Sequence, residues 1–153
     1  MRASPLYTLA VIALVALGGQ SSVRAQGDQS VLGPGMYVFQ TRTRSASCGD
    51  DERTGYVSTF LAPIHGVPGS RTMRMTLENS EYWPVWQITV DAQNQVVGHA
   101  TLAGASGANA PTNHFEVRRQ RDRFVGTGTR RYERGGRQCA VEYDALLRRI
   151  DQL

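Results

Sequence analysis

The sequence contains no lysine, so all 17 of its basic residues are arginines. We interpret this as the codon bias of a GC-rich bacterium. Loss of an N-terminal signal that includes Arg2 and Arg24 leaves 15 arginines against 13 acidic residues, a net charge of +2. A nearly balanced exported chain is a poor candidate for nucleic-acid binding, which depends on a strongly basic surface.

Catalytic motifs are also absent from the sequence, which has no nucleophile elbow, no phosphate-binding glycine loop and no Cys-x-x-Cys. The three histidines, His65, His99 and His114, lack metal-ligand spacing, and no loop has the alternating oxygen ligands of a calcium site. The acidic run Asp50–Glu52 is interpreted as a solvated loop. We therefore expect a protein that is not an enzyme and that has no metal and no cofactor.

Long apolar runs are absent except near the start of the chain. Residues 1–25 resemble a Sec-type secretory signal, with a basic start, an apolar run over 6–17 and a cleavage point at 23–25. The run is shorter than the roughly 20 residues that span a bilayer, so we expect no stable membrane anchor. We predict a periplasmic or secreted protein, with a flexible leader over 26–34 and one domain over 35–153.

Cysteine occurs only twice, at Cys48 and Cys139. In a small exported chain, two cysteines predict one disulfide. The bond would close a loop of roughly 90 residues, which stabilises a fold by up to about 4–5 kcal/mol in the chain-entropy model.

Most of the remaining sequence alternates between apolar and polar residues, the pattern of half-buried strands. Turn signals divide it into eight predicted strands: residues 35–44, 54–64, 70–78, 82–91, 95–102, 115–120, 124–132 and 137–143. The last ten residues change to helical spacing, and Asp144 can cap their start, so we predict a short C-terminal helix over residues 144–153.

The clearest stretch, residues 113–143, predicts three antiparallel strands joined by two-residue turns at Arg121-Asp122 and Gly135-Gly136. A one-residue slip would scramble the inner and outer faces, so the register is well determined. It predicts these cross-strand neighbours: Gly126 with Val117, Gly128 with Phe115 and Tyr143, Arg130 with Val141, and Tyr132 with Cys139.

Eight short, regularly spaced strands predict an all-β domain, either an antiparallel barrel or a β-sandwich. The cysteines favour the barrel. In a closed up-and-down barrel the first strand pairs antiparallel with the last, which brings the end of the first strand, next to Cys48, close to Cys139. The arrangement resembles the calycin type in architecture, as in lipocalin-like or avidin-like barrels, some of which carry a helix after the last strand.

Four residues are candidates for a ligand site in such a barrel: Arg130, Tyr132, Trp86 and Tyr143. Arg130 is the most informative, because a charge on the inner face requires an ion-pair partner, water at the barrel mouth, or an acidic ligand group. Trp83 and Trp86 flank Pro84, and we expect one of these indoles in the core and the other near the rim. Residues 104–112 form a long connection that could act as a lid.

Two further features were interpreted from the outer faces of the strands. Arginines cluster on the last three strands, and Arg118, Arg121, Arg131 and Arg134 form a predicted basic patch, either for an anionic partner or for solubility. His99 faces outward if residues 92–94 form a three-residue turn with Asn94 in the left-handed conformation, and inward if the loop has four residues.

Three functions remain open at this point. The first is an exported, monomeric, non-catalytic binding protein whose small barrel holds a small or anionic ligand. The second is an envelope protein-interaction or inhibitor module that uses the arginine-rich surface. A cavity favours the first function and a filled interior the second. The third is an enzyme, which requires a histidine within hydrogen-bond reach of an acid inside a pocket.

Overall fold

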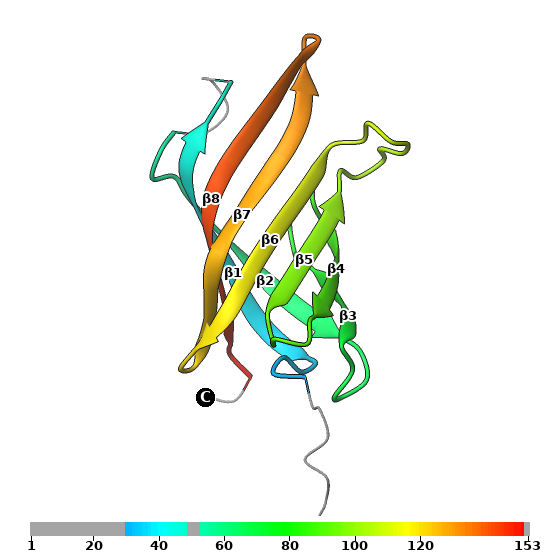
Figure 1. Cartoon of the computed structure of the whole chain (residues 1–153), viewed down its shortest axis with the longest axis vertical. Coiled ribbons are helices and arrows are strands. Elements are labelled where there is room, and N and C mark those ends of the chain that lie inside the picture. Colours follow the sequence, from blue (N-terminus) through cyan, green and yellow to red (C-terminus); the bar gives the residue numbers. More distant parts are fainter. Residues whose placement is uncertain (1–29, 49–52, 152–153) are drawn as a thin grey trace, which may run out of the picture.

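A computed structural model describes residues 30–48 and 53–151 of the chain. The predicted signal peptide and the acidic run Asp50–Glu52 lie outside the described residues. Eight antiparallel strands form a closed barrel in sequence order, with β8 paired back to β1 (Figure 1). The strands are β1 (Gly35–Ala46), β2 (Val57–His65), β3 (Thr72–Thr76), β4 (Val85–Val90), β5 (Val96–Thr101), β6 (Thr112–Gln120), β7 (Arg123–Arg134) and β8 (Arg137–Arg149). The all-β class and the up-and-down barrel are confirmed, and the sandwich alternative is not observed.

The last three strands pair in the predicted register. Gly126 lies opposite Val117, and Gly128 lies between Phe115 and Tyr143. The predicted partners of Arg130 and Tyr132 are also confirmed. Gly135 and Gly136 join β7 to β8 with φ of 58° and 73°, the positive values that this two-residue turn requires.

The predicted C-terminal helix is wrong. β8 continues to Arg149 and pairs with β1 on one side and β7 on the other. Its residues Tyr143, Ala145 and Leu147 are buried in alternation, the period of a strand. Leu147 fits both the helical and the strand spacing, and the hydrogen bonds available at both neighbouring strand edges decide in favour of the strand. Among the described residues, no helix is long and apolar enough to cross a membrane.

Aromatic rings fill the middle of the barrel. Phe39, Trp86 and Phe115 are fully buried, with ring centroids 4.9–5.7 Å apart. Gly98 makes room for this cluster, because a side chain there would meet the ring of Phe115. The fold is therefore organised around a packed interior.

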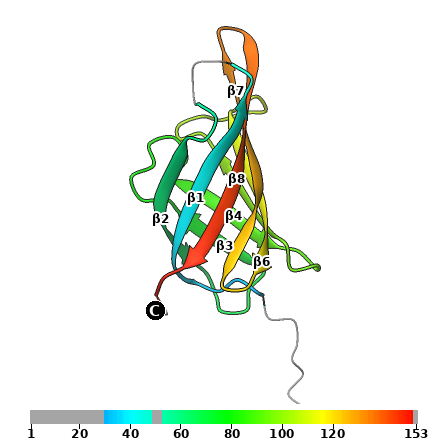
Figure 2. The ribbon, with the colours of Figure 1, turned by 90° about the vertical axis from the view of Figure 1, so that its left-hand side faces the viewer.

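The two ends of the barrel differ (Figures 1 and 2). At the closed end lie the β2–β3, β4–β5 and β6–β7 turns and the segment before β1, whose Leu32 is fully buried. At the open end lie the other connections, and there the β7–β8 hairpin projects beyond the rest of the barrel. The predicted disulfide Cys48–Cys139 is present at the base of this hairpin, with a Cα–Cα distance of 5.5 Å.

Strand pairing is uneven around the barrel. β1 and β8 share nine paired positions and β7 and β8 share twelve, whereas β2 and β3 share two. Beyond those two pairs, the main-chain amide of Glu78 donates to the carbonyl oxygen of Leu61. The β2–β3 contact is therefore the shortest ladder in the barrel.

Candidate functional site

A small cavity of about 50 Å³ lies inside the open end of the barrel. Side chains from several strands and from the β3–β4 connection line it, with apolar, hydroxyl, amide and guanidinium groups. They are Phe39, Thr41, Ser58, Phe60, Leu77, Ser80, Trp83, Trp86, Asn113, Arg130 and Tyr143.

Three of the four predicted ligand residues meet at this open-end cavity. Arg130, Trp86 and Tyr143 line it, and Arg130 is half-buried near the end of the barrel proper, opposite Asn113 on β6. Tyr132 does not line the cavity, because it lies two residues further along β7, on the projecting hairpin. The structure thus brings the predicted cation together with two of the three predicted aromatics.

The two tryptophans form one unit at the cavity wall. The Trp86 indole is 1% exposed and belongs to the core, as predicted. Trp83 comes from the open-end connection before β4 but is also buried, at 7% exposure. The Trp86 Nε1 group donates to the main-chain carbonyl oxygen of Trp83 at 2.9 Å, which orients the Trp86 indole and holds the main chain at Trp83 against it.

Asn113 is a site residue that the sequence patterns did not reveal. It is one of two buried polar residues among those described, and its Oδ1 accepts a hydrogen bond of 2.6 Å from the Tyr143 hydroxyl. The amide N–H groups of Asn113 add donors to a cavity wall that already carries Arg130. β6 begins at Thr112, earlier than predicted, and Asn113 shares the inner face with Phe115, two residues further along the strand. Extending the predicted β6 backward from Phe115 with the same alternation would have placed Asn113 inside the barrel.

The size of the cavity limits what can enter it. Pockets for small organic ligands typically measure about 300–1,000 Å³. A volume of about 50 Å³ holds a few waters or a group of carboxylate size. The buried rings of Phe39, Trp86 and Phe115 pack against one another in the middle of the barrel, so this cavity has no room for a whole organic ligand.

The predicted basic patch separates into two groups. Arg118 and Arg121 lie at the closed end, beside the β6–β7 turn, whereas Arg131 and Arg134 lie on the hairpin at the open end. β7 has 12 residues. Arg118 lies opposite Val125, six residues before Arg131 on β7, and a strand rises by about 3.3 Å per residue, so even the nearest members of the two groups stand roughly 20 Å apart along the barrel.

Exposed apolar side chains gather at the open end. Among the described residues, five large apolar side chains are exposed, and four of them lie in or next to open-end connections. These four are Tyr56, Val57, Tyr82 and Val85. Exposed apolar groups of this kind, beside charged ones, are typical of surfaces that contact other proteins.

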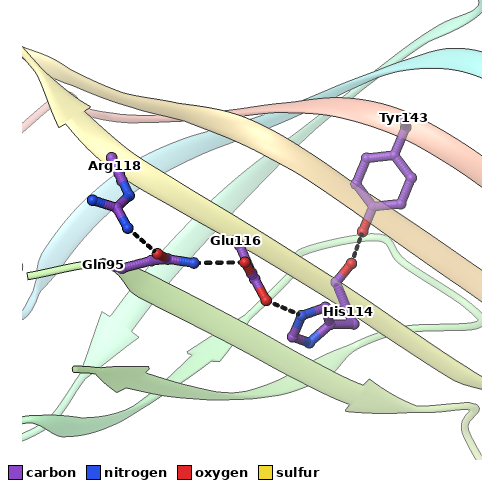
Figure 3. A network of polar contacts seen from close by, with 5 residues as sticks. All are labelled: Gln95, His114, Glu116, Arg118 and Tyr143. Atoms are coloured by element: carbon purple, nitrogen blue, oxygen red, sulfur yellow. Dashed lines mark hydrogen bonds and ion pairs between the residues drawn. The ribbon is translucent and has the colours of Figure 1, made fainter. Parts of the chain in front are cut away.

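The histidines lie outside the cavity. His99 is exposed and faces outward, and Asn94 has a φ of 60°, as the three-residue turn requires. His114 Nε2 lies 3.1 Å from Glu116 Oε1, but both side chains are on the outer face, 40% and 52% exposed. Gln95 and Arg118 extend this contact into a surface network (Figure 3).

The histidine–acid contact therefore does not meet the condition set for an enzyme, which was a pair inside a pocket. Within the described ranges, no group of three or more His, Cys, Asp or Glu side chains is placed to hold a metal ion.

A charged contact ties the two ends of the barrel domain together at the closed end. Arg149 Nε donates to Asp151, whose other oxygen accepts from the Met36 amide at 2.9 Å. The hydrogen bond from Arg149 holds the pKa of Asp151 below its ordinary value. Burial raises the pKa of the Tyr37 hydroxyl, which donates to the Gly33 carbonyl oxygen. The Tyr37 ring lies under the Arg149 guanidinium.

Fold and site together define a class: a packed, closed eight-stranded antiparallel barrel with a small cavity of mixed polar and apolar lining at its open end. No protein-family model matches the chain, and searches of curated proteins and of solved structures find no match either.

Proposed function

We propose that the protein is an exported, non-catalytic binding protein that holds an acidic segment of a partner protein at its open end. The observations that carry this proposal are the aromatic cluster packed in the middle of the barrel and the small volume of the open-end cavity, about 50 Å³. A barrel of this kind can present a surface but has little room for an enclosed organic ligand.

The positive charge of the β7–β8 hairpin favours a partner with negative charge. Residues 130–138 contain four arginines and one acidic residue, Glu133. Guanidinium groups bind carboxylates through two parallel hydrogen bonds, which lysine cannot match. The hairpin therefore favours a partner that presents aspartate or glutamate side chains.

The open-end cavity fits one such carboxylate. Arg130 supplies positive charge at its wall, and the amide of Asn113 and the hydroxyl of Ser58 supply hydrogen-bond donors. The indoles of Trp83 and Trp86 supply an apolar wall that excludes water around the bound group. In this arrangement one acidic side chain enters the cavity while its neighbours contact the hairpin.

The exposed apolar side chains at the same end would pack against the rest of the partner. Interfaces between proteins combine a buried apolar centre with a polar rim, and Tyr and Arg are enriched in them. Tyr56 and Tyr82 provide two exposed aromatic rings beside the arginines. The disulfide suits an oxidising compartment, and we propose a monomer in the periplasm or outside the cell.

The proposal is tested by capture and affinity measurement. The oxidised protein is immobilised, exposed to envelope and extracellular proteins of its source organism, and eluted with salt. The dissociation constant of any captured protein is then measured for the wild type, for Arg131→Gln/Arg134→Gln at the open end, and for Arg121→Gln/Arg123→Gln at the closed end. The two double variants lose the same charge, so they are matched controls.

We expect the open-end variant to weaken binding about tenfold or more, and the closed-end variant to change it by less than about twofold. Arg130→Leu should abolish the interaction without unfolding the barrel. Equal effects of the two double variants, or a partner that binds through a basic surface, would contradict the proposal. A small molecule that stays bound in native mass spectrometry, with no protein partner, would favour the small-ligand function instead.

A further inference from the structure

A second and larger depression lies at the closed end of the barrel, away from the open-end cavity. It is a groove of about 440 Å³ between the segment before β1 and the β6–β7 turn, beside the last residues of β8. This volume falls within the typical range for small-molecule sites, about 300–1,000 Å³. The sequence predicted arginines beside the β6–β7 turn. The groove is also lined by residues of β8 and of the start of the domain, which the sequence pattern did not bring together.

Positive charge dominates the lining of this closed-end groove. Arg119, Arg148 and Arg149 line it, with Asp122 as the single acidic residue among the described lining residues. Arg149 is engaged by Asp151, whereas Asp122 forms no ion pair within the described part of the chain. The groove therefore has more guanidinium charge than its own acid can neutralise.

Two of the arginines near the groove oppose each other. Arg148 on β8 lies directly across from Arg123 on β7, and neither forms an ion pair with another described residue. Like charges directly opposite on neighbouring strands destabilise a sheet. An anion bound beside Arg148 would offset this repulsion.

Part of the groove is already ordered for such an anion. Arg119 Nε donates to the Arg121 carbonyl oxygen at 3.2 Å, which restrains its side chain near the turn. The aromatic residues Tyr37 and Phe124 are buried and form part of the wall. The site thus combines a restrained guanidinium, a second exposed guanidinium on Arg148, and an apolar wall.

We propose that the closed-end groove binds a phosphoryl group through Arg119 and Arg148, with Tyr37 and Phe124 beside the organic part that carries it. A tetrahedral dianion has enough acceptor oxygens for two guanidinium forks, whereas a carboxylate is satisfied by one. The phosphoryl group can belong to a free phosphate ester or to the headgroup of an anionic phospholipid. This site is independent of the open-end proposal, because it lies at the other end of the barrel.

The experiment compares three proteins: the wild type, Arg119→Gln/Arg148→Gln, and the matched control Arg42→Gln/Arg74→Gln, which loses the same charge at two exposed positions on β1 and β3 that line neither the groove nor the open-end cavity. Pyrophosphate is titrated into each at low ionic strength and followed by ¹⁵N NMR. In a second arm, each protein is mixed with vesicles of phosphatidylglycerol and phosphatidylcholine, or of phosphatidylcholine alone. Thermal unfolding with and without pyrophosphate shows that each variant is folded and reports binding independently.

In the wild type, we expect saturable changes in the ¹⁵N chemical shifts of the β6–β7 turn and of the end of β8. The dissociation constant for pyrophosphate should be about tenfold higher in Arg119→Gln/Arg148→Gln and nearly unchanged in the control. Without ligand, that variant should unfold at or above the wild-type temperature, because it removes the Arg123–Arg148 opposition. Binding to phosphatidylglycerol vesicles alone would identify the lipid headgroup as the source, and binding to pyrophosphate alone a free phosphate ester. Absence of binding in both arms, or an equal loss in the control, overturns the proposal.

Discussion

Reduction of the disulfide Cys48–Cys139 should lower the unfolding temperature by about 15–20 °C. The two cysteines are 91 residues apart in the sequence. For a loop of this length, the chain-entropy model gives about 4–5 kcal/mol at 25 °C. Unfolding entropy is about 2.1 cal/mol/K per residue, or roughly 0.25 kcal/mol/K for a domain of about 120 residues, and the ratio gives the expected shift.

The native state should lose little when the bond is broken. Ser47 and Ala140, next to the two cysteines, already hold the strands together: the Ser47 amide donates to the Ala140 carbonyl oxygen at 2.9 Å, and the Ala140 amide donates to Ser47 Oγ at 2.8 Å. The effect of reduction therefore falls on the unfolded chain, which gains conformational freedom.

The assay is thermal and urea unfolding of the oxidised protein and of the same protein in a phosphine reductant. The variant Cys48→Ala/Cys139→Ala, which should not respond to reductant, controls for effects of the reagent. Beyond the lower midpoint, we expect a larger dependence of the unfolding free energy on urea, because the reduced unfolded chain exposes more surface. Equal midpoints for the oxidised and reduced forms would refute the entropic reasoning.

Three further substitutions test other parts of the structure. Gly126→Ala should destabilise the protein by about 2 kcal/mol or more in urea unfolding, because the added methyl group would clash with the main chain of β6. The control is Gly33→Ala, whose methyl group would have its nearest neighbour 3.8 Å away and which should change the unfolding midpoint little. Tyr143→Phe should cost about 1–2 kcal/mol in the same assay, since buried Asn113 loses a partner at 2.6 Å; a neutral effect would mean that water replaces the hydroxyl. The pKa of Asp151 is lowered in the folded state, so its contribution is present above the ordinary value of 3.8 and is lost as the pH falls below it. Asp151→Asn should therefore flatten the dependence of unfolding temperature on pH in that acidic range, and an unchanged slope would show that the Arg149 contact adds no stability.

The register of the last three strands could be predicted because two independent constraints agree there. Two-residue turns fix how the strands pair, and alternation of apolar residues fixes which face is buried, so a single register satisfies both. The closure of the barrel followed from one long-range constraint, the position of Cys48 relative to Cys139. The sequence supplies no comparable constraint for β2 to β5, but alternation alone located them to within a few residues.

Other features depend on spatial relations that no local pattern carries. The end of β8 was mistaken for a helix because Leu147 fits either period, and only the two neighbouring strands select the extended form. The arginines of β6 and β7 were expected to form one patch because they are close in sequence. β7 is long, however, and it separates Arg121 in the β6–β7 turn from Arg134 at the opposite end of the barrel. The closed-end groove combines residues from both ends of the domain, so no sequence window contains it.

The short ladder between β2 and β3 changes how the barrel can be described. Opened at that ladder, the molecule is a curled sheet in the order β3-β4-β5-β6-β7-β8-β1-β2, and the two ends of the described domain fall at the sixth and seventh strands, inside the sheet rather than at its edges. The ends are already joined by hydrogen bonds, since the Ile150 amide donates to the Met36 carbonyl oxygen at 2.9 Å. A circular permutant that links them and starts at the exposed β2–β3 turn, near Gly69, would move the chain ends to the natural edges of that sheet.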